Sequence, residues 1–435
     1  MKREHLFLVV TGVVFVALTI LFVVFPRPSY SELEKRDLAA FPEWNVERLS
    51  DGSFTGDVSA WFSDSEPYRD RFLSLSMALK ELIGIRLPDD DNVRFHAEAA
   101  TSAPTDEELE TSNRDIAEVK TAGAAEVAKV AAAGIIVAGS GENVRAMMVY
   151  KGEASGGRAW AETANALKRG FGPKVNLYCM VIPTPIEYYC PDKVRSRTYR
   201  QLPTIRNIYS LLDDSVKAVD VYTPLGRHVA EPIYHRTDHH WTPLGAYYAA
   251  KKFAQVAKVP FVPLSRFVKH VCPGFVGSMY GYSKDISVKK APENFEYYTP
   301  LDTNYTTTYI AYNLDKDYKV TSQSAPFNGK FFDTRFRGAA RYSMFMGGDA
   351  RLTKVETSLN NGRRLLIIKD SFGNALPPFL FGSFEQVHVV DHRYFTENLV
   401  DYVTRNGITD VLMANNIFNA YSAGVAKAIR SLAEQ

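Results

Sequence analysis

The chain has 435 residues, of which 46% are hydrophobic and 23% are charged. This is ordinary globular composition with enough apolar material for a large core, and the length allows two or three domains. The 51 basic and 49 acidic residues leave a formal net charge of +2, which gives no electrostatic signature of nucleic-acid binding. The sequence also lacks a phosphate-binding loop of the G-x-x-x-x-G-K type.

The N-terminus carries a long apolar segment. Residues 6–25, LFLVVTGVVFVALTILFVVF, contain no charge and are long enough to cross a bilayer of roughly 30 Å as a helix. A secretory signal usually has a shorter apolar region and a small-residue cleavage site, which is missing here. We therefore predict a cytoplasmic tail at 1–5 and an uncleaved membrane anchor at 6–25, with a cleaved signal as the alternative. Either way, the main domain is expected on the extracytoplasmic side, in the periplasm or at the cell surface.

Two segments separate this anchor from the main domain. Residues 26–87 include apolar and aromatic positions with helical spacing around 67–84, which predicts an amphipathic helix and a helical stalk. Residues 88–134 are rich in Ala, Glu and Lys and contain few large apolar side chains. Such composition predicts a linker or a surface insertion rather than core.

From residue 135 to 435 short apolar runs alternate with helical segments. The runs that predict strands are 175–183, 218–224, 364–370, 386–391 and 409–416. Continuous apolar strands separated by helices indicate an α/β fold with a parallel sheet buried on both faces. Residues 270–345 are instead alternating and aromatic, which predicts an inserted antiparallel β segment.

A serine follows one of these strands directly. In RLLIIKDSFGN the strand ends at Asp370, and Ser371 comes next. The carboxyl ends of parallel strands are where open α/β sheets place their sites, and the N–H groups of such a turn can face a developing oxyanion. The sequence does not match the G-x-S-x-G nucleophile elbow. A serine that merely caps a helix is the alternative interpretation.

The motif TDHHWTPLGAYYAA, from residue 237, places an acid and two histidines before a helix. Thr242 is a predicted N-cap and Pro243 the first helical residue. The positive end of the helix dipole favours a neutral histidine, as a general base requires. Asp238 and His240 are two residues apart, so in an extended segment they project to the same side and the acid can orient the imidazole.

A metal site is a competing interpretation of the same motif. Asp238, His239, His240 and the nearby His235 are possible zinc ligands. In an extended segment, however, adjacent histidines point to opposite faces, so we expect that His239 and His240 do not share one ion. H-E-x-x-H and C-x-x-C motifs are missing as well, and a structural polar cluster is the third possibility. We expect no metal and no cofactor.

Together TDHHWTPLGAYYAA, LLIIKDSFGNALPPFL and VHVVDHRYF resemble the DHHW family, which is related to the SGNH-hydrolase-like proteins AlgX and AlgJ of alginate O-acetylation. The pattern LEKRDLAAFPEW…WFSDSEPYRDRF also fits the N-terminal part of this family. The resemblance covers most of the chain except about 88–134. It implies a flavodoxin-like, SGNH-type parallel-sheet domain in which the Asp-x-His pair precedes the serine, whereas the serine comes first in ordinary SGNH proteins.

The resemblance also implies roles for particular residues. Ser371 matches the nucleophile, His240 the base, and Asp238 the acid that orients it. The oxyanion donors match less clearly because no G-x-N-D block is present, and the candidates are Gly348, Asn374 and Asn415. Three further residues are candidates for binding substrate or shaping the site: His239, Trp241 and Arg393.

The function implied by the family is O-acetylation of an extracytoplasmic polysaccharide. Ser371 would carry the acetyl group from a membrane-bound O-acyltransferase (MBOAT) partner to a sugar hydroxyl, in two steps that share one base. An esterase with the same three residues would instead remove acetyl groups. A protein of another class, a non-catalytic glycan-binding scaffold of an envelope complex, is the remaining alternative.

Overall fold

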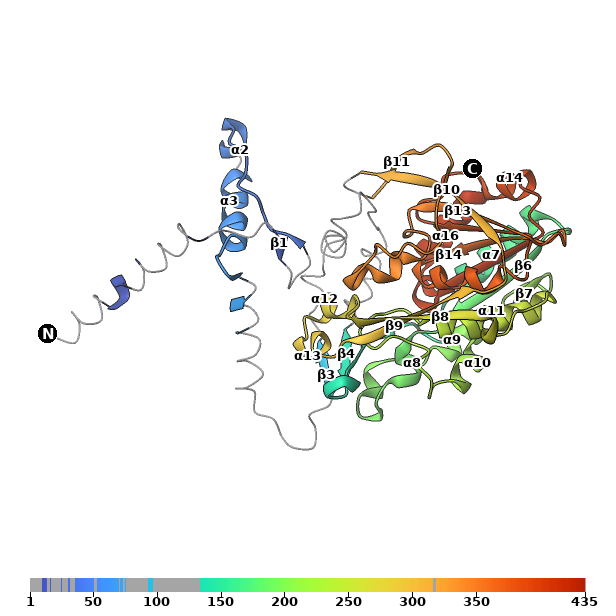
Figure 1. The fold of residues 1–435 in the computed structure, drawn as a ribbon, viewed down its shortest axis with the longest axis horizontal. Helices are drawn as coiled ribbons and strands as arrows, with labels where there is room; N and C mark the ends of the chain where they lie inside the picture. Colours follow the sequence, from blue (N-terminus) through green and yellow to red (C-terminus); the bar gives the residue numbers. More distant parts are fainter. Residues whose placement is uncertain are drawn as a thin grey trace. The chain divides into compact units, whose positions relative to one another are not determined.

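The computed structural model divides the chain into two compact units, Met1–Arg86 and Leu87–Gln435, each described separately below (Figure 1). The residues that it describes are 10–13, 16, 25, 30–31, 36–50, 53–69, 71–72, 75, 93–96, 134–315 and 318–434. Most of the predicted anchor at 6–25 and of the predicted helix at 67–84 therefore lies outside the described residues. Among the residues described, no helix is long and apolar enough to span a membrane.

The described residues of the first unit include the helices α2 (Val46–Ser50) and α3 (Ser53–Asp64) and the antiparallel strands β1 (Tyr30–Ser31) and β2 (Arg36–Asp37). The N–H of Ala39 donates a hydrogen bond of 3.0 Å to the Asp64 carboxylate, which ties the segment before α2 to the end of α3. The Phe41 ring lies edge-on against Trp61 at 4.9 Å. The described part of the predicted stalk therefore contains the strand pair β1–β2 as well as helices.

The second unit is built on a nine-stranded mixed sheet. Its strands, in spatial order, are β11 (Val320–Gln323), β10 (Tyr305–Leu314), β13 (Arg351–Thr357), β15 (Gln386–Asp391), β14 (Arg364–Lys369), β16 (Asp410–Asn416), β6 (Asn176–Ile182) and β7 (Val216–Ala218), with β12 (Phe327–Asn328) also paired to β10. The five strands from β15 to β7 are parallel, and β10 and β13 extend them in antiparallel register.

The order of the parallel strands explains why Asp238 and His240 precede Ser371. If the strands are counted from β14 through β15 and β16 and then on to β6 and β7, the spatial order is 2-1-3-4-5, that of a flavodoxin-like sheet. Among these five strands, however, β6 and β7 come first in the sequence and β14, β15 and β16 follow. Their order along the chain is therefore a circular permutation of the flavodoxin-like order. The switch point of the sheet lies at β14, and β14 leads directly into Ser371.

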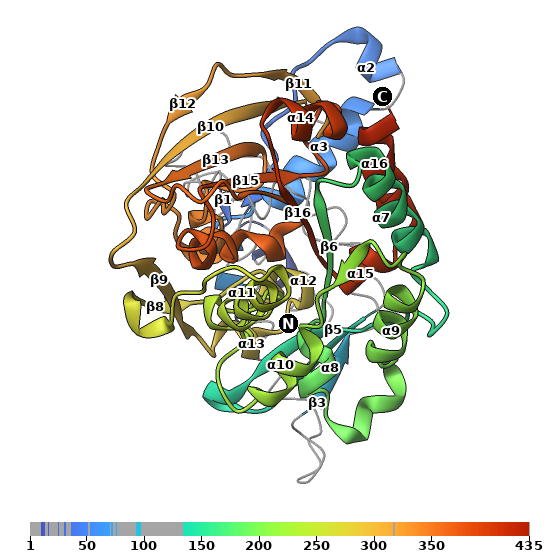
Figure 2. The same cartoon turned by 90° about the vertical axis from the view of Figure 1, so that its right-hand side faces the viewer.

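Helices lie on both faces of the sheet (Figure 2), and each face has its own hydrophobic core. Alternate residues of each parallel strand point to opposite faces; in β14, Leu365 and Ile367 enter one core and Leu366 and Ile368 the other. The first core contains α11 (Pro243–Ala257), and the second contains α7 (Arg158–Phe171), α9 (Leu202–Ser210), α14 (Leu399–Arg405) and α16 (Ala423–Glu434). Burial on both faces is the reason that these strands are continuously apolar.

One predicted strand ends early and is followed by a helix. The run at 218–224 predicts a strand, but β7 ends at Ala218 and α10 (Tyr222–Arg227) follows. The Asp220 side chain accepts hydrogen bonds from the N–H and the hydroxyl of Thr223. These local bonds start a helical turn, and Asp is a residue that competes with strand pairing in this way.

The predicted antiparallel insert consists of two different parts. β8 (Phe267–Phe275) and β9 (Glu293–Pro300) form a separate antiparallel pair, whereas β10 joins the main sheet through β13. The predicted linker at 88–134 also contains a strand, β3 (Val93–His96), which pairs with β4 (Ile135–Ala138) and through it with β5 (Arg145–Met148). The alternation of β10 and of β3 shows that they are strands but does not show which strand is the partner.

Candidate active site

The turn after β14 presents Ser371 at the switch point of the sheet. Asp370 caps the short 3-10 helix Ser371–Ala375, and its carboxylate accepts from the N–H of Phe372 at 3.0 Å. The other Asp370 oxygen accepts from the side-chain amides of Asn416 and Asn419 at 2.9 and 3.0 Å. These bonds fix the backbone on the N-terminal side of the serine, and Ser371 itself is only partly buried.

His240 connects Ser371 to Asp238. Its Nε2 lies 2.7 Å from Ser371 Oγ, and its Nδ1 lies 2.6 Å from Asp238 Oδ1. The His240 N–H also donates to Asp238 Oδ1 at 3.0 Å. The structure thus brings Asp238 and His240 together with Ser371, which lies 131 positions after His240 in the sequence. This is the geometry in which an imidazole can take a proton from a serine while a carboxylate orients it.

Asp238 is buried and held on both oxygens. Its Oδ2 accepts from the N–H and the hydroxyl of Ser278, both at 2.9 Å. Burial by itself would raise the pKa of Asp238, but the surrounding histidines, first among them His240, hold that pKa well below its usual range. A Cβ on Gly277 would lie 2.3 Å from the Asp238 Cβ. Only glycine therefore allows the Ser278 backbone to approach the carboxylate this closely.

A buried glutamate supports the segment that carries Asp238. Glu293 at the start of β9 accepts from the N–H groups of Arg236 and Thr237 and from the Thr237 hydroxyl, at 2.7–3.0 Å. Burial raises the pKa of Glu293, but the adjacent His235 and these donors outweigh it and lower the pKa to about 2. The charged carboxylate thus organises a stretch that has no strand or helix of its own.

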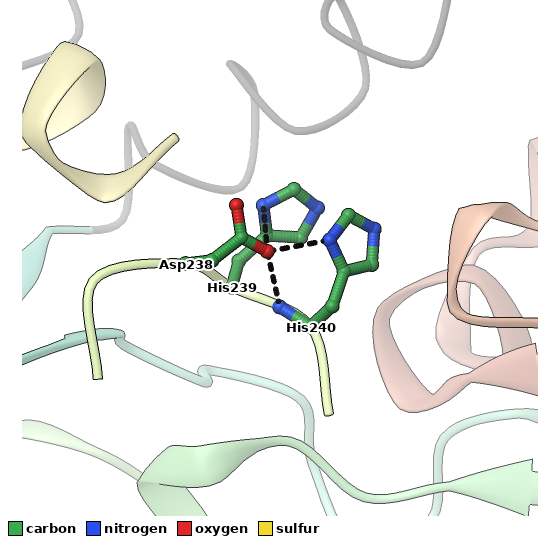
Figure 3. A group of neighbouring side chains, drawn as sticks. All are labelled: Asp238, His239 and His240. Atoms are coloured by element: carbon green, nitrogen blue, oxygen red, sulfur yellow. Dashed lines mark hydrogen bonds and ion pairs between the residues drawn. The ribbon is translucent and has the colours of Figure 1, made fainter. Parts of the chain in front are cut away.

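His239 lies beside His240, which contradicts the expectation that adjacent histidines face apart. The two ring centroids are 3.7 Å apart, and the Nδ1 atoms of both rings lie on the side of the Asp238 carboxylate (Figure 3). The backbone bends through 236–240 instead of running extended, so the alternation of a strand does not apply. His239 Nδ1 lies 2.7 Å from Ser278 Oγ, and burial and the adjacent His240 lower the pKa of His239 to about 3.

The His240 ring is packed on both faces, and its neighbours also contact the turn that carries Ser371. Tyr342 stacks on the ring at 3.9 Å with an interplanar angle of 3°, opposite to the contact from His239. The Tyr342 hydroxyl and the Trp241 indole N–H both donate to the carbonyl of Phe372, at 3.3 and 2.7 Å. Trp241 therefore has a positioning role, because it joins the motif at 237–242 to the residue that follows Ser371.

Ser371 opens into a small cavity. Its volume is about 30 Å³ for the centres of water-sized groups, room for roughly two or three of them. The wall is formed by β5, by the segments that follow β6, β14, β15 and β16, and by His239; it comprises Ala146, Met147, Met148, Thr184, Pro185, His239, Asp370, Ser371, Phe372, Arg393, Asn416, Phe418 and Asn419. An acyl carbonyl with its methyl group matches this space.

The three predicted oxyanion donors do not line this cavity. The Asn374 amide donates to Asp349 at 2.8 Å, and the Asn415 amide bridges the Ile368 carbonyl and the Asp370 N–H. Gly348 belongs to a turn before β13, and its N–H donates to the Phe345 carbonyl. All three support the fold around the site. The sequence spacing does not reveal these bonds, because they join segments such as the turn before β13 and the end of β16 that meet only in the folded protein.

Beneath the cavity lies a buried group of four charges. Lys369 donates to Asp349 and Asp391 at 2.7 and 2.9 Å, and Arg393 donates to both carboxylates as well. Burial disfavours the charged forms, but the opposite charges lower the pKa of both carboxyl groups and raise the pKa of both cations. All four groups are therefore ionised, and they balance each other in charge.

The same side chains could also be considered as metal ligands. Asp238, His239 and His240 offer three donor atoms within 4.8 Å of one another. The expectation that His239 and His240 point too far apart to share one ion is therefore wrong. Those atoms, however, already form the hydrogen bonds described above. An ion held by them would displace the bonds between Asp238 and His240, and the arrangement that links His240 to Ser371 is the better match to the donors present.

Comparison with known proteins places the chain in a family. The model of the DHHW protein family matches residues 34–108 and 115–390. The chain belongs to the DHHW family. A DHHW family protein from Eubacterium siraeum is 39% identical, with a TM-score of 0.61, over 69% of this chain and 95% of that one. No curated protein matches the sequence.

Two more distant structures are also similar, of which PatB1 shares the fold. PatB1 from Bacillus cereus, solved with a sulfonyl adduct, is 17% identical with a TM-score of 0.54, over 66% of this chain and 96% of that one. The O-acetyltransferase domain of AlgJ from Pseudomonas putida is 12% identical with a TM-score of 0.35, over 64% of this chain and 89% of that one. The predicted membership in the DHHW family is thus confirmed.

Proposed function

We propose that this DHHW protein is a serine-dependent O-acetyltransferase that acts on an extracytoplasmic polysaccharide. The observation that carries the proposal is the chain of contacts from Asp238 through His240 to Ser371, 2.6 and 2.7 Å long, beside a cavity of acyl size. The AlgJ structure is of an O-acetyltransferase domain, which is consistent with this chemistry. At 12% identity and a TM-score of 0.35, that similarity is too low to support the proposal.

In the proposed cycle His240 takes the Ser371 proton as Oγ attacks the acetyl carbonyl. The new ester bond forms when the donor oxygen leaves with the proton from His240. A sugar hydroxyl then gives its proton to His240, attacks the acetyl-serine, and releases Ser371. Asp238 stays ionised throughout, because its pKa is held low, and stabilises the imidazolium that forms in each step.

Delivery of the acetyl group is assigned to a membrane-bound O-acyltransferase, with residues 6–25 anchoring the domain near it. A soluble form that lacks residues 1–28, exported with a cleavable signal, is expected to hydrolyse a small activated acetyl ester normally. It is expected to acetylate polysaccharide poorly in the cell. Normal cellular acetylation by the soluble form would refute the need for the anchor, while a mature N-terminus beyond residue 25 would refute the anchor itself.

An esterase with the same three residues is the second candidate, because water can reach a partly exposed Ser371. The discriminating experiment incubates the protein with an acetyl ester and oligosaccharide acceptors and follows both acetate and acetylated sugar. Transfer predicts Ser371-dependent acetylated sugar, and hydrolysis predicts acetate alone. Both activities are expected to survive EDTA; loss with EDTA and recovery with Zn²⁺ would favour the metal site instead.

A further inference from the structure

Arg393 is a cationic side chain in the wall of the cavity that also contains Ser371. It follows β15, next to the carboxyl end of β14, so the parallel pairing of the two strands brings it to the nucleophile turn. Ser371 and Arg393 line the same cavity, so an acyl group bound at Ser371 would share that space with the Arg393 side chain. The site lacks an assigned donor for the charge that develops on that carbonyl.

The guanidinium is fixed in orientation by two carboxylates. Arg393 Nε and Nη2 donate to the two oxygens of Asp391, each at 2.7 Å, and Nη2 also donates to Asp349 at 3.1 Å. This fork leaves Nη1, which forms no hydrogen bond with any residue in the described part of the chain. Its side chain is 11% exposed, so little water competes for that donor.

Two neutral donors in the same wall are already engaged with Asp370. The side-chain amides of Asn416 and Asn419 both donate to its carboxylate. His239 is neutral; its Nδ1 lies 2.7 Å from Ser278 Oγ, and its Nε2 has no hydrogen-bond partner among the described residues. Among the described residues that line the cavity, Arg393 therefore combines permanent charge, fixed geometry and a free N–H pair.

We infer that Arg393 donates from Nη1 to the acyl carbonyl oxygen and stabilises the oxyanion of the tetrahedral intermediate. As the Ser371 Oγ–carbon bond forms, the carbonyl π electrons move to oxygen and the Ser371 proton moves to His240. When the intermediate collapses, the C=O bond re-forms and the leaving alkoxide takes the proton from His240. Arg393 is thus a catalytic residue whose hydrogen bond strengthens only as negative charge develops.

The inference rests on the proposed function and is tested with the full chain on a small acetyl ester. Arg393→Gln is expected to lower kcat by roughly 10²–10³-fold with little change in KM, the effect of losing one oxyanion donor. Arg393→Lys retains the charge pairs of the cluster, so the variant is expected to fold. Its kcat is expected to fall about tenfold, because an ammonium lacks the planar N–H pairs that fix the orientation of a guanidinium. Guanidinium added to Arg393→Ala is expected to restore part of kcat.

Arg363→Gln is the matched control. Arg363 also forms a two-bond fork with a buried aspartate, donating to Asp410 at 2.7 and 2.6 Å, but at the opposite end of β14. The Arg363→Gln substitution is expected to lower the thermal midpoint of unfolding while kcat stays within twofold of the wild-type value. A purely structural role of Arg393 predicts the same pattern for Arg393→Gln, and a wild-type kcat in a folded Arg393→Gln or Arg393→Lys protein would overturn the inference. Wild-type protein without Ser371-dependent hydrolysis would overturn the proposed function and this inference together.

Discussion

The two ends of β14 both carry buried charged residues, but they are built differently. At the amino end Asp410 is fully buried and accepts from Arg363, Tyr178 and Thr409, so its oxygens are saturated by structural donors. At the carboxyl end Ser371 faces both His240 and a cavity. Buried charge alone therefore does not mark a site. What distinguishes the carboxyl end is a reactive oxygen with a base on one side and space on the other.

Ser371→Ala gives the largest expected effect and tests the carboxyl end directly. We expect hydrolysis of a small acetyl ester to fall by roughly 10⁴-fold or more. The thermal midpoint should remain close to that of the wild type, because a partly exposed hydroxyl contributes little packing. Ester hydrolysis and a circular-dichroism melt measure the two quantities. Full polysaccharide acetylation in cells that contain only this variant would leave a binding role as the remaining function.

His240→Ala is expected to cost nearly as much activity, and Asp238→Asn somewhat less, about 10³–10⁴-fold. The asparagine cannot hold the imidazole in the tautomer that accepts the serine proton. Because the three residues act as one unit, adding His240→Ala or Asp238→Asn to Ser371→Ala should not lower kcat below that of Ser371→Ala alone. Additive losses in kcat would show that Asp238 and His240 act independently of Ser371.

Gly277→Ala tests the packing that holds Asp238. The added Cβ would meet the Asp238 Cβ at 2.3 Å, so the carboxylate must move away from Ser278 and His240. A displacement of this size is expected to lower kcat by roughly 10²-fold. Gly407→Ala is the control at the amino end, where φ is +59°; it should cost about 1 kcal/mol of stability and leave kcat unchanged. Equal effects of the two substitutions on kcat would contradict the comparison.

Asp410→Asn is expected to reverse this pattern. Loss of the carboxylate leaves Arg363 without its fork, and breaking such a pair costs about 3 kcal/mol. The urea midpoint should fall while kcat stays within twofold. A large loss of kcat in a protein that is still folded would mean that the amino end is coupled to the site.

The last prediction concerns the pH dependence of stability. The His239 pKa of about 3 lies below the ordinary value of 6.5, so the unfolded chain binds a proton on this side chain at a pH where the folded protein does not. Its contribution to stability is fully present above about pH 6.5 and is lost toward pH 3, with a slope of up to about 1.4 kcal/mol per pH unit. His239→Gln should make the urea midpoint depend less steeply on pH between pH 6 and 4. An unchanged slope would show that His239 is protonated in the folded state.

The sequence predicts those parts of the fold that depend on local patterns. Strands such as β6 and β14 are recognisable because both of their faces are buried, and the start of α11 follows from Thr242 and Pro243. The resemblance to the DHHW family contributes the expectation that Asp238, His240 and Ser371 meet. The permuted strand order is a property of the whole sheet and has no local signal.

The rest of the site depends on contacts between distant segments. Ser278 and Tyr342 come from segments without a distinctive motif, and they contact Asp238 and His240 only once the chain is folded. The position of His239 differs from the prediction because the backbone bends at 236–240. The amides of Asn374 and Asn415 have the correct chemistry for an oxyanion donor, but tertiary contacts engage them elsewhere.

The most direct test of the central claim is mass spectrometry of the protein after brief exposure to an activated acetyl ester. The account predicts a transient increase by the mass of one acetyl group, which peptide mapping places on Ser371 and which disappears when an acceptor sugar is added. Asp238→Asn should form this adduct slowly, and Asp410→Asn should form it at the wild-type rate. An acetyl group on another residue, or turnover of the ester with Ser371 replaced by alanine, would contradict the account.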